Sequence, residues 1–139
     1  MTETSCDVLI LGAGTGGTAA ALALQGWGLR VILTEPTDWV GGQLTSQLVP
    51  PDEHPWIETC GRTLRYAEYR DRVRQWYRDH GDLTDIAARD KRLNPGSGWV
   101  SWICHRPDVG EKVLRDMLGP ALAEGLDLRL ETVPIAAQT

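Results

Sequence analysis

The sequence predicts an α/β fold with parallel strands, and the arrangement of its first 35 residues leads to this prediction. Two short apolar runs, at 7–11 and 29–35, have the length and composition of strands buried in a parallel sheet. Between them lie a glycine-rich turn at 12–17 and an alanine- and leucine-rich helix at 18–25, which Gly26 ends. A strand, a turn, a helix and a second strand form a βαβ unit, whose strands are parallel and whose crossover is right-handed.

Length and charge limit the kinds of protein that this chain can be. Its 139 residues carry 19 acidic and 14 basic side chains, a formal net charge of −5, and 42% are hydrophobic, which is typical of one globular domain or part of one. The acidic balance disfavours nucleic acid and anionic membrane surfaces as partners. Glycines interrupt the amino-terminal apolar run, so we predict neither a signal peptide nor a membrane span.

Cysteine spacing indicates the redox environment. Cys6, Cys60 and Cys104 lie more than 40 residues apart and form no CxxC pair. Such spacing favours reduced thiols over a disulfide framework or a zinc site. We therefore predict a cytoplasmic protein without a metal site.

Irregular segments and helices alternate beyond residue 35. Turn residues dominate 36–63, and a loop of this length is usually functional or disordered. Apolar residues at helical spacing predict an amphipathic helix over 64–80, which Gly81 ends and whose charged side we expect to face solvent. The charged residues of that side are Glu68, Arg70, Asp71, Arg72, Arg74 and Arg78.

The carboxyl-terminal part predicts a loop at 82–98, an extended segment at 99–105, and a helix and third strand within 107–133. Asp108 and Glu111 have the spacing of a capping box, so the helix should begin near Pro107. Pro120 falls where that helix should continue and predicts a break or kink. Alternating apolar residues over 127–133 predict the third strand.

Three glycines in the first turn have the spacing GxGxxG, at Gly12, Gly14 and Gly17. The motif follows a predicted strand and opens a predicted helix, which is the context that a Rossmann-like dinucleotide-binding fold requires. The first glycine permits the tight turn, the second lets the backbone approach a pyrophosphate, and the third lets the helix lie close to the strand. Glycines that serve helix packing alone are the alternative interpretation.

Glu35 supplies the second part of this hypothesis, at the end of the second strand and 23 residues after Gly12. A carboxylate there can accept hydrogen bonds from both ribose hydroxyls of an adenosine, and it would repel a 2′-phosphate. FAD or NAD is therefore favoured over NADP. A solvated carboxylate at a strand end is the alternative.

The segment after Glu35 favours a flavin over a nicotinamide. Residues 35–47, EPTDWVGGQLTSQ, resemble the FAD-dependent oxidoreductases of the glutathione-reductase-like class. The chain is most similar to large FAD-dependent oxidoreductases in which WVGGQLTSQ, a PPDEHPWIE-like segment and a YRxxVRxWYR-like helix follow in this order. The resemblance covers most of 6–133, and its most specific parts are Gly41 to Thr45 and residues 50–58.

The resemblance implies FAD as the cofactor and assigns contacts to individual residues. Gly12, Gly14 and Gly17 would face the pyrophosphate of FAD, and Glu35 would hold the adenosine ribose. Positions implied beside the pyrophosphate and ribityl chain are Gly42, Gln43 and Thr45. Val133, on the third strand, is where this class uses backbone groups to hold the adenine.

The long loop contains the candidate catalytic residue. Asp52, Glu53 and His54 form a dense cluster of acid–base groups, and His54 near a flavin can act as a general acid or base. A polar loop between two prolines explains the same three residues, and consecutive side chains do not readily converge on a metal ion.

Two other histidines have structural interpretations. Cys104 and His105 could form a nucleophile and its base, but adjacent residues on an extended segment point to opposite faces. We therefore expect Cys104 to be a buried thiol. His80 precedes Gly81, and we expect it to satisfy carbonyl groups at the end of a helix.

Together these patterns predict that 1–139 is the amino-terminal part of an FAD-binding domain. Its predicted parts are a βαβ core at 6–35, a cofactor-facing loop at 36–63, an amphipathic helix at 64–80, and a helix and third strand at 107–133. We expect this domain to be incomplete, because the later strand and Gly-Asp motif that close the family's FAD site have no counterpart.

The predicted function is an FAD-binding segment of a flavin-dependent oxidoreductase. It would move a hydride or an electron pair between a small organic substrate and a second acceptor. The remaining carboxyl-terminal part of the same protein or a partner subunit would complete the site. Two alternatives stay open: an NAD-binding dehydrogenase domain, and a non-catalytic fragment that folds only with a partner chain.

Overall fold

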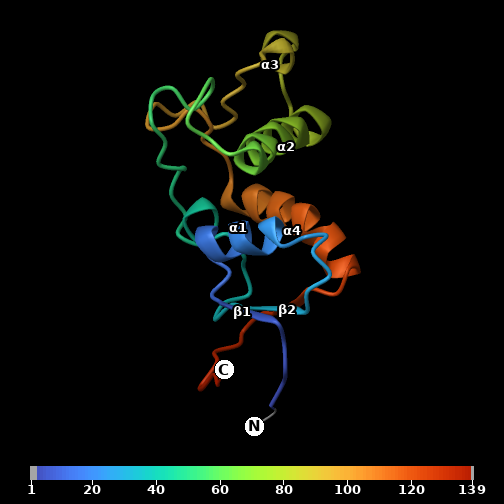
Figure 1. Cartoon of the computed structure of the whole chain (residues 1–139). Coiled ribbons are helices and arrows are strands. Elements are labelled where there is room, and N and C mark those ends of the chain that lie inside the picture. Colours follow the sequence, from blue (N-terminus) through green and yellow to red (C-terminus); the bar gives the residue numbers. More distant parts are fainter. Residues whose placement is uncertain (1–2, 139) are drawn as a thin grey trace.

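A computed structural model describes residues 3–138 of the chain. Its elements are β1 (Val8–Leu11), α1 (Thr15–Ala23), β2 (Val31–Thr34), the 3-10 turn η1 (Gly42–Leu44), α2 (Leu64–His80), α3 (Asp85–Arg89), α4 (Pro107–Ala123) and β3 (Asp127–Arg129). Figure 1 shows the elements in tiers, with the sheet below, α1 and α4 above it, and α2 and α3 farthest from the sheet.

The three strands form one parallel sheet in which β2 lies between β1 and β3. Val8 of β1 pairs with Val31, and Ile32 of β2 pairs with Asp127. Parallel strands with helices between them confirm the predicted Rossmann-like α/β fold. β3 ends earlier than the sequence predicts because the chain turns away at Glu131, whose φ is 49°.

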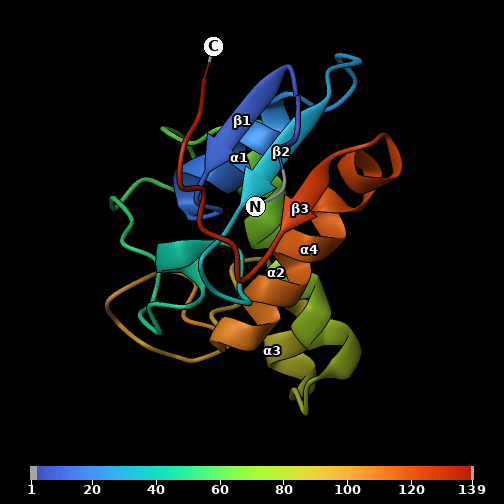
Figure 2. The ribbon, with the colours of Figure 1, turned by 90° about the horizontal axis from the view of Figure 1, so that it is seen from below.

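The two faces of the sheet have different coverings. Val8, Ile10 and Leu33 pack into the core against the helices. Leu9 and Leu11 project from the opposite face, because strand side chains alternate, and Leu11 is 61% exposed. Figure 2 shows the chain after β3 crossing the end of β2 and continuing toward β1.

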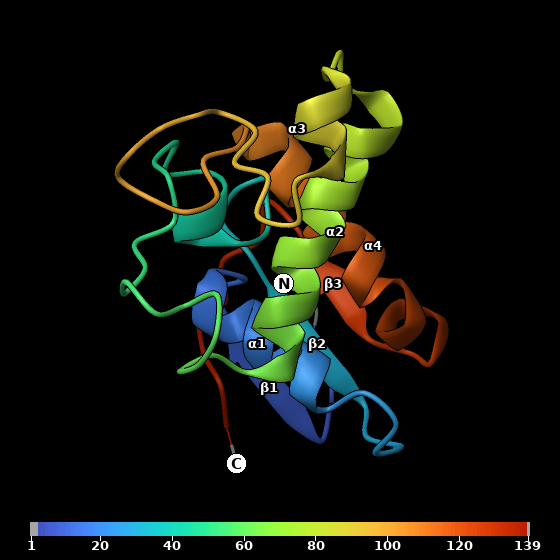
Figure 3. The same ribbon diagram turned by 90° about the horizontal axis from the view of Figure 1, so that it is seen from above.

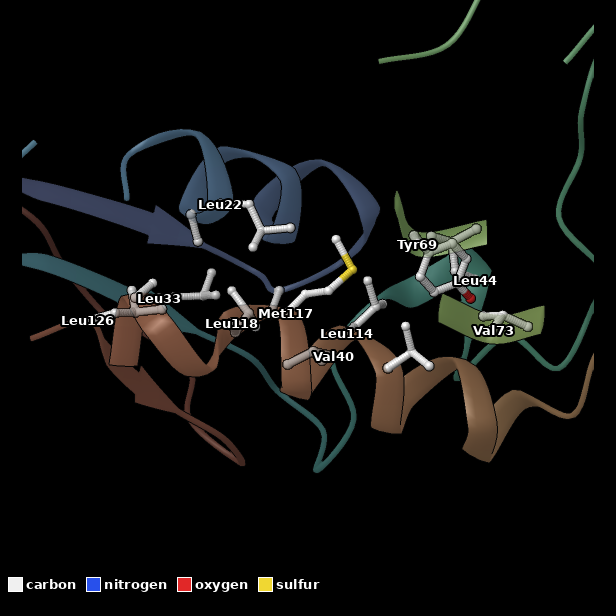
Figure 4. Packing of buried hydrophobic residues seen from close by; sticks show 14 of the residues in the cluster. Leu22, Leu33, Val40, Leu44, Tyr69, Val73, Leu114, Met117, Leu118 and Leu126 are labelled. Atoms are coloured by element: carbon white, nitrogen blue, oxygen red, sulfur yellow. The ribbon is translucent and has the colours of Figure 1, made fainter. Parts of the chain in front are cut away.

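The core fills the space between the sheet, α1 and α4, and extends up to α2 (Figure 4). Leu33 and Leu118 are completely buried at its centre. Tyr69 and Val73 of α2 join the same cluster, so α2 packs on α4 on the side away from the sheet (Figure 3). Burying one such side chain contributes about 1.5–3 kcal/mol, so this cluster stabilises the packing of α1 and α4 on the sheet.

Helix ends differ from the sequence predictions in two places. α4 continues through Pro120 to Ala123. A proline in the last turn of a helix removes only one backbone N–H donor, and the carbonyl groups of that turn lack helical partners in any case. The predicted capping box at Asp108 and Glu111 is wrong. Arg106 is the residue before the helix and has no side-chain cap bond, and Asp108 pairs with Arg106 instead.

Two segments of the second half also depart from prediction. The predicted loop at 82–98 contains α3, which Thr84 caps by accepting a hydrogen bond from Ala87 N–H at 3.3 Å. The segment at 99–105 forms turns in place of an extended strand. Asn94 fixes these turns by donating to the carbonyls of Gly98 and Ser101.

The charged side of α2 is only partly solvated, and the prediction was wrong for Arg70 and Arg74. Both are buried, at 1% and 3% exposure. Arg70 pairs with Glu53 and Glu58, while Arg74 pairs with Glu58 at 2.5 Å and donates to the Leu93 carbonyl at 2.9 Å. Because Glu53 and Glu58 belong to the long loop after β2, these ion pairs hold that loop on α2.

Further hydrogen bonds complete this buried cluster. Tyr66 donates to Glu53 Oε1 at 2.7 Å, and Ser101 donates to Oε2 at 3.2 Å. Burial works to raise the pKa of Glu58, but the Arg74 hydrogen bond and the charges of Arg70 and Arg74 bring it below its usual range. Two carboxylates and two guanidinium groups therefore balance in charge within the fold.

Candidate functional site

Two glycines of the turn between β1 and α1, Gly12 and Gly17, are required for steric reasons. Gly12 has φ of +88°, a conformation that other residues rarely adopt. A Cβ at Gly17 would lie 1.9 Å from the Gly12 carbonyl oxygen, so α1 can approach the turn only through a glycine. Thr18 then fixes the turn from inside, because its hydroxyl donates to the Ala13 carbonyl at 2.8 Å.

The amino terminus of α1 begins immediately after this turn and has no side-chain cap. Gly14 precedes the helix and offers no side chain to its first N–H groups, and the first turn contains no acidic residue. The first N–H groups of any helix lack partners within the helix, and together they give its start a partial positive charge. A Cβ built on Gly14 meets nothing within 4 Å, so the space beside it is open. The arrangement suits an anion.

Glu35 lies against the same turn. Its Oε2 accepts a hydrogen bond from the Ala13 amide at 2.8 Å, and its Oε1 accepts from the amide and the hydroxyl of Thr37, at 3.1 and 2.9 Å. The structure thus brings the predicted ribose carboxylate and the glycine turn together, although 22 residues separate Ala13 from Glu35.

The loop after β2 returns to the start of α1 and crosses it closely. Gly41 donates its amide to the Ala13 carbonyl at 2.7 Å and accepts from the Thr15 hydroxyl at 2.9 Å. A Cβ at Gly42 would lie 3.0 Å from the Gly14 Cα, and the φ of Gly42 is +53°. Two glycines are therefore needed for two stretches of backbone to meet here.

Of the remaining residues expected at the site, Gln43 is exposed beside this crossing, whereas Thr45 is fully buried. The Thr45 hydroxyl donates to the Val40 carbonyl at 2.5 Å and closes the loop from within. Val133 is 66% exposed. It follows Thr132, whose amide donates to the Glu35 carbonyl at 2.9 Å, so residues 131–133 lie beside Glu35.

The candidate catalytic histidine lies in a separate part of the long loop. His54 is exposed, and its Nδ1 accepts from the Trp56 amide at 3.2 Å while Nε2 faces the Gly61 carbonyl at 3.4 Å. Its neighbour Glu53 points inward to Arg70, so the Asp52–His54 cluster is divided between surface and interior. A catalytic role for His54 stays a prediction.

The other two histidines take structural positions. His80 Nδ1 lies 3.0 Å from the Trp76 carbonyl, which is the predicted contact at the end of α2. Cys104 is buried and His105 turns the other way, toward Tyr69. Burial lowers the pKa of His105 and raises that of Tyr69.

Thr37, Thr15 and the Ala13 amide belong to the site, but sequence reasoning missed them. The contact of Thr37 could have been predicted from the sequence, since a threonine two residues after a carboxylate can donate a hydrogen bond to it within a turn. The contacts of Thr15 and Ala13 could not have been predicted, because they depend on where the loop after β2 crosses α1.

Residues 7–139 match the protein family described as FAD dependent oxidoreductase. The chain belongs to this family. FAD is the cofactor that the family implies, so the predicted cofactor and the prediction of a flavin-binding oxidoreductase segment are confirmed. The narrower group marked by GGQLTSQ stays a prediction. A search of curated proteins finds no match.

The glycine turn, the open start of α1 and the Glu35 carboxylate fit the dinucleotide part of FAD, because they pair uncapped N–H groups with a hydrogen-bond acceptor. Between residues 3 and 138, no three side chains of the metal-binding types come together around one point. Within that same range, every helix is too short or too polar to cross a membrane.

Proposed function

We propose that this oxidoreductase segment binds the adenosine and pyrophosphate part of FAD at the carboxyl end of β1 and β2. The observation that carries the proposal is the hydrogen bond from the Ala13 amide to Glu35, which fixes a carboxylate next to the uncapped start of α1. One edge of the site thus offers N–H donors for phosphates, and the other offers acceptors for ribose hydroxyls.

Each predicted residue has a role in this proposal. Gly12 and Gly14 keep side chains away from the pyrophosphate, Gly17 lets α1 lie close to the turn, and Gly42 lets the loop after β2 cross beside it. Gln43 is exposed at that crossing and can donate to the phosphates or the ribityl chain. The buried Thr45 holds the loop in shape, and the backbone near Val133 lies beside Glu35, so it would border an adenine bound there.

Bound FAD supplies the ability to accept and return a hydride or an electron pair. The described residues of this chain supply position and electrostatics, because the backbone donors and the Glu35 carboxylate orient the dinucleotide. We further propose that the reaction oxidises or reduces a small organic molecule and uses a second acceptor or donor. Residues beyond this chain, from the same protein or a partner subunit, would shape the substrate pocket. The three free cysteines favour a reducing compartment such as the cytoplasm.

FAD titration of the 139-residue chain, followed by quenching of flavin fluorescence, tests the proposal. Wild type should bind FAD saturably. Glu35→Gln should weaken binding at least tenfold, because it removes one charge-assisted hydrogen bond of about 1.5–3 kcal/mol. Asp38→Asn is the matched control, since Asp38 is an exposed carboxylate three residues away and should leave the affinity unchanged.

Competition with NADH distinguishes the alternative dehydrogenase domain. We expect FAD to bind more tightly than NADH, and NADPH to bind more weakly than both, because Glu35 would repel the 2′-phosphate. Tighter binding of NADH than of FAD would contradict the proposal. Absence of saturable FAD binding by a folded wild-type chain would contradict it as well.

A further inference from the structure

Thr37 contacts the Glu35 carboxylate twice and has a second acceptor within reach. Its amide and hydroxyl both donate to Oε1. The same hydroxyl oxygen lies 3.1 Å from the Trp39 carbonyl and accepts from the Trp39 amide at 3.2 Å. A hydroxyl group has a single proton, so Thr37 donates to Glu35 or to Trp39, but never to both at once.

We propose that Thr37 is a positioning residue whose hydroxyl holds Glu35 in place before FAD binds and then turns to the Trp39 carbonyl. This inference rests on the proposed function. A carboxylate has about four acceptor positions, two on each oxygen. Thr37 fills both positions on Oε1, and the Ala13 amide fills one on Oε2.

One free acceptor position cannot serve the two hydroxyls of an adenosine ribose. The second ribose hydroxyl can donate to Oε1 only when the Thr37 hydroxyl leaves it. The Trp39 carbonyl makes this exchange possible, because the Thr37 proton has another acceptor and its oxygen keeps the bond from the Trp39 amide. Neither partner loses a hydrogen bond during the exchange.

The arrangement also lowers the entropy lost on binding. A free glutamate side chain must be immobilised when it grips a ribose, and this immobilisation weakens binding. Glu35 is already oriented by the Ala13 amide and by Thr37, so a nucleotide meets a fixed acceptor. The effect should concern only ligands that carry ribose hydroxyls.

Two nucleotides separate this role from general support of the loop. ADP carries both ribose hydroxyls, and 2′,3′-dideoxy-ADP carries neither. Their dissociation constants, and that of FAD, would be measured by calorimetry with wild type, Thr37→Val and Thr37→Ser. Thr59→Val is the matched control, because the Thr59 hydroxyl also donates to a loop carbonyl, that of Trp56, at 3.1 Å. Thr37→Ala, with circular dichroism, repeats the test if the valine variant is unfolded.

Wild type should bind ADP more tightly than the dideoxy nucleotide. Thr37→Val should reduce that preference about fivefold, because the affinity for ADP falls while the affinity for the dideoxy nucleotide stays unchanged. FAD affinity should fall by the same factor. Thr37→Ser and Thr59→Val should behave as wild type. An equal loss for both nucleotides, or an unchanged preference in a folded Thr37→Val, overturns the inference and leaves the proposed function intact. A wild type that binds neither FAD nor ADP overturns the proposed function itself.

Discussion

The phenol of Tyr69 donates a hydrogen bond of 2.8 Å to Nε2 of His105, in the layer between α2 and the start of α4. The His105 Nδ1 donates to the Ile103 carbonyl at 3.0 Å, so both ring nitrogens are used by the neutral imidazole. Burial lowers the pKa of His105 below its usual value of 6.5. This pair makes the stability of the fold depend on pH.

His105 should reduce stability as the pH falls. Below pH 6.5 the unfolded chain takes up a proton that the folded His105 resists, so the free energy of unfolding should decrease between pH 6.5 and the lowered pKa. One group can contribute a slope of at most about 1.4 kcal/mol per pH unit at 25 °C. Urea unfolding from pH 7.5 to 5.5 measures it. His105→Gln should flatten the slope, and an unchanged slope in that variant would show that His105 is not its cause.

The buried ion pairs predict a large difference between two arginines of one helix. Arg70→Met leaves Glu53 without its guanidinium partner in the interior and should lower the free energy of unfolding by about 3–5 kcal/mol. Arg72 is exposed on the same helix and pairs with Glu68, so Arg72→Met should cost less than about 1 kcal/mol. Chemical denaturation measures the free energy of unfolding of both variants. Equal losses would show that the buried Arg70 ion pair contributes no more than the exposed one.

Glu58 should contribute stability at neutral pH that disappears in acid. Its pKa is lowered in the folded state, so its contribution is present above about pH 4.5 and is lost as the pH falls through the folded value. Glu58→Gln should therefore be clearly less stable than wild type at pH 6, and the gap should narrow toward pH 3.5. The exposed Asp71→Asn serves as a control. A gap independent of pH would rule out the charge of Glu58 as its cause.

The crossing of Gly42 over the start of α1 should not tolerate a side chain. Gly42→Ala adds a Cβ 3.0 Å from the Gly14 Cα and 3.3 Å from the Thr15 nitrogen, at a positive φ. We expect a loss of about 1–2 kcal/mol in stability and at least tenfold weaker FAD binding. Gly119→Ala is the control, because its Cβ meets nothing within 4 Å in α4 and should stabilise by up to about 1 kcal/mol. Thermal melting measures the change in stability of each variant, and FAD titration measures the change in FAD affinity.

The sequence allowed the βαβ unit and its motif to be predicted because the relevant information is local. The apolar runs, the glycines and Glu35 lie within the first 35 residues, and each is recognisable from residue type and spacing alone. Burial of Arg70 and Arg74 is different, because their partners lie 12 to 17 residues earlier, in a loop without periodicity. The sequence alone therefore does not distinguish an arginine that is paired inside the fold from one that faces solvent.

Within the site, the same physical limit explains what was missed. The contact of Glu35 with the glycine turn follows from parallel pairing of β1 and β2, so the sequence could suggest it. The burial of Thr45 and the two-acceptor position of Thr37 depend on the path of the loop between Glu35 and Gln47. That path is set by contacts with Ala13 and Thr15, which only the folded chain brings near.

The pairing of Ile32 with Asp127 has a consequence for synthesis on the ribosome. Residues 35–126 separate β2 from β3, so one edge of β2 stays unpaired until residues 127–129 have left the exit tunnel. Strand pairings between residues so distant form slowly, and unpaired edges are prone to aggregation while they wait. At translation rates of about 5–20 residues per second, the waiting time is on the order of seconds. Nascent chains should therefore engage chaperones in that interval.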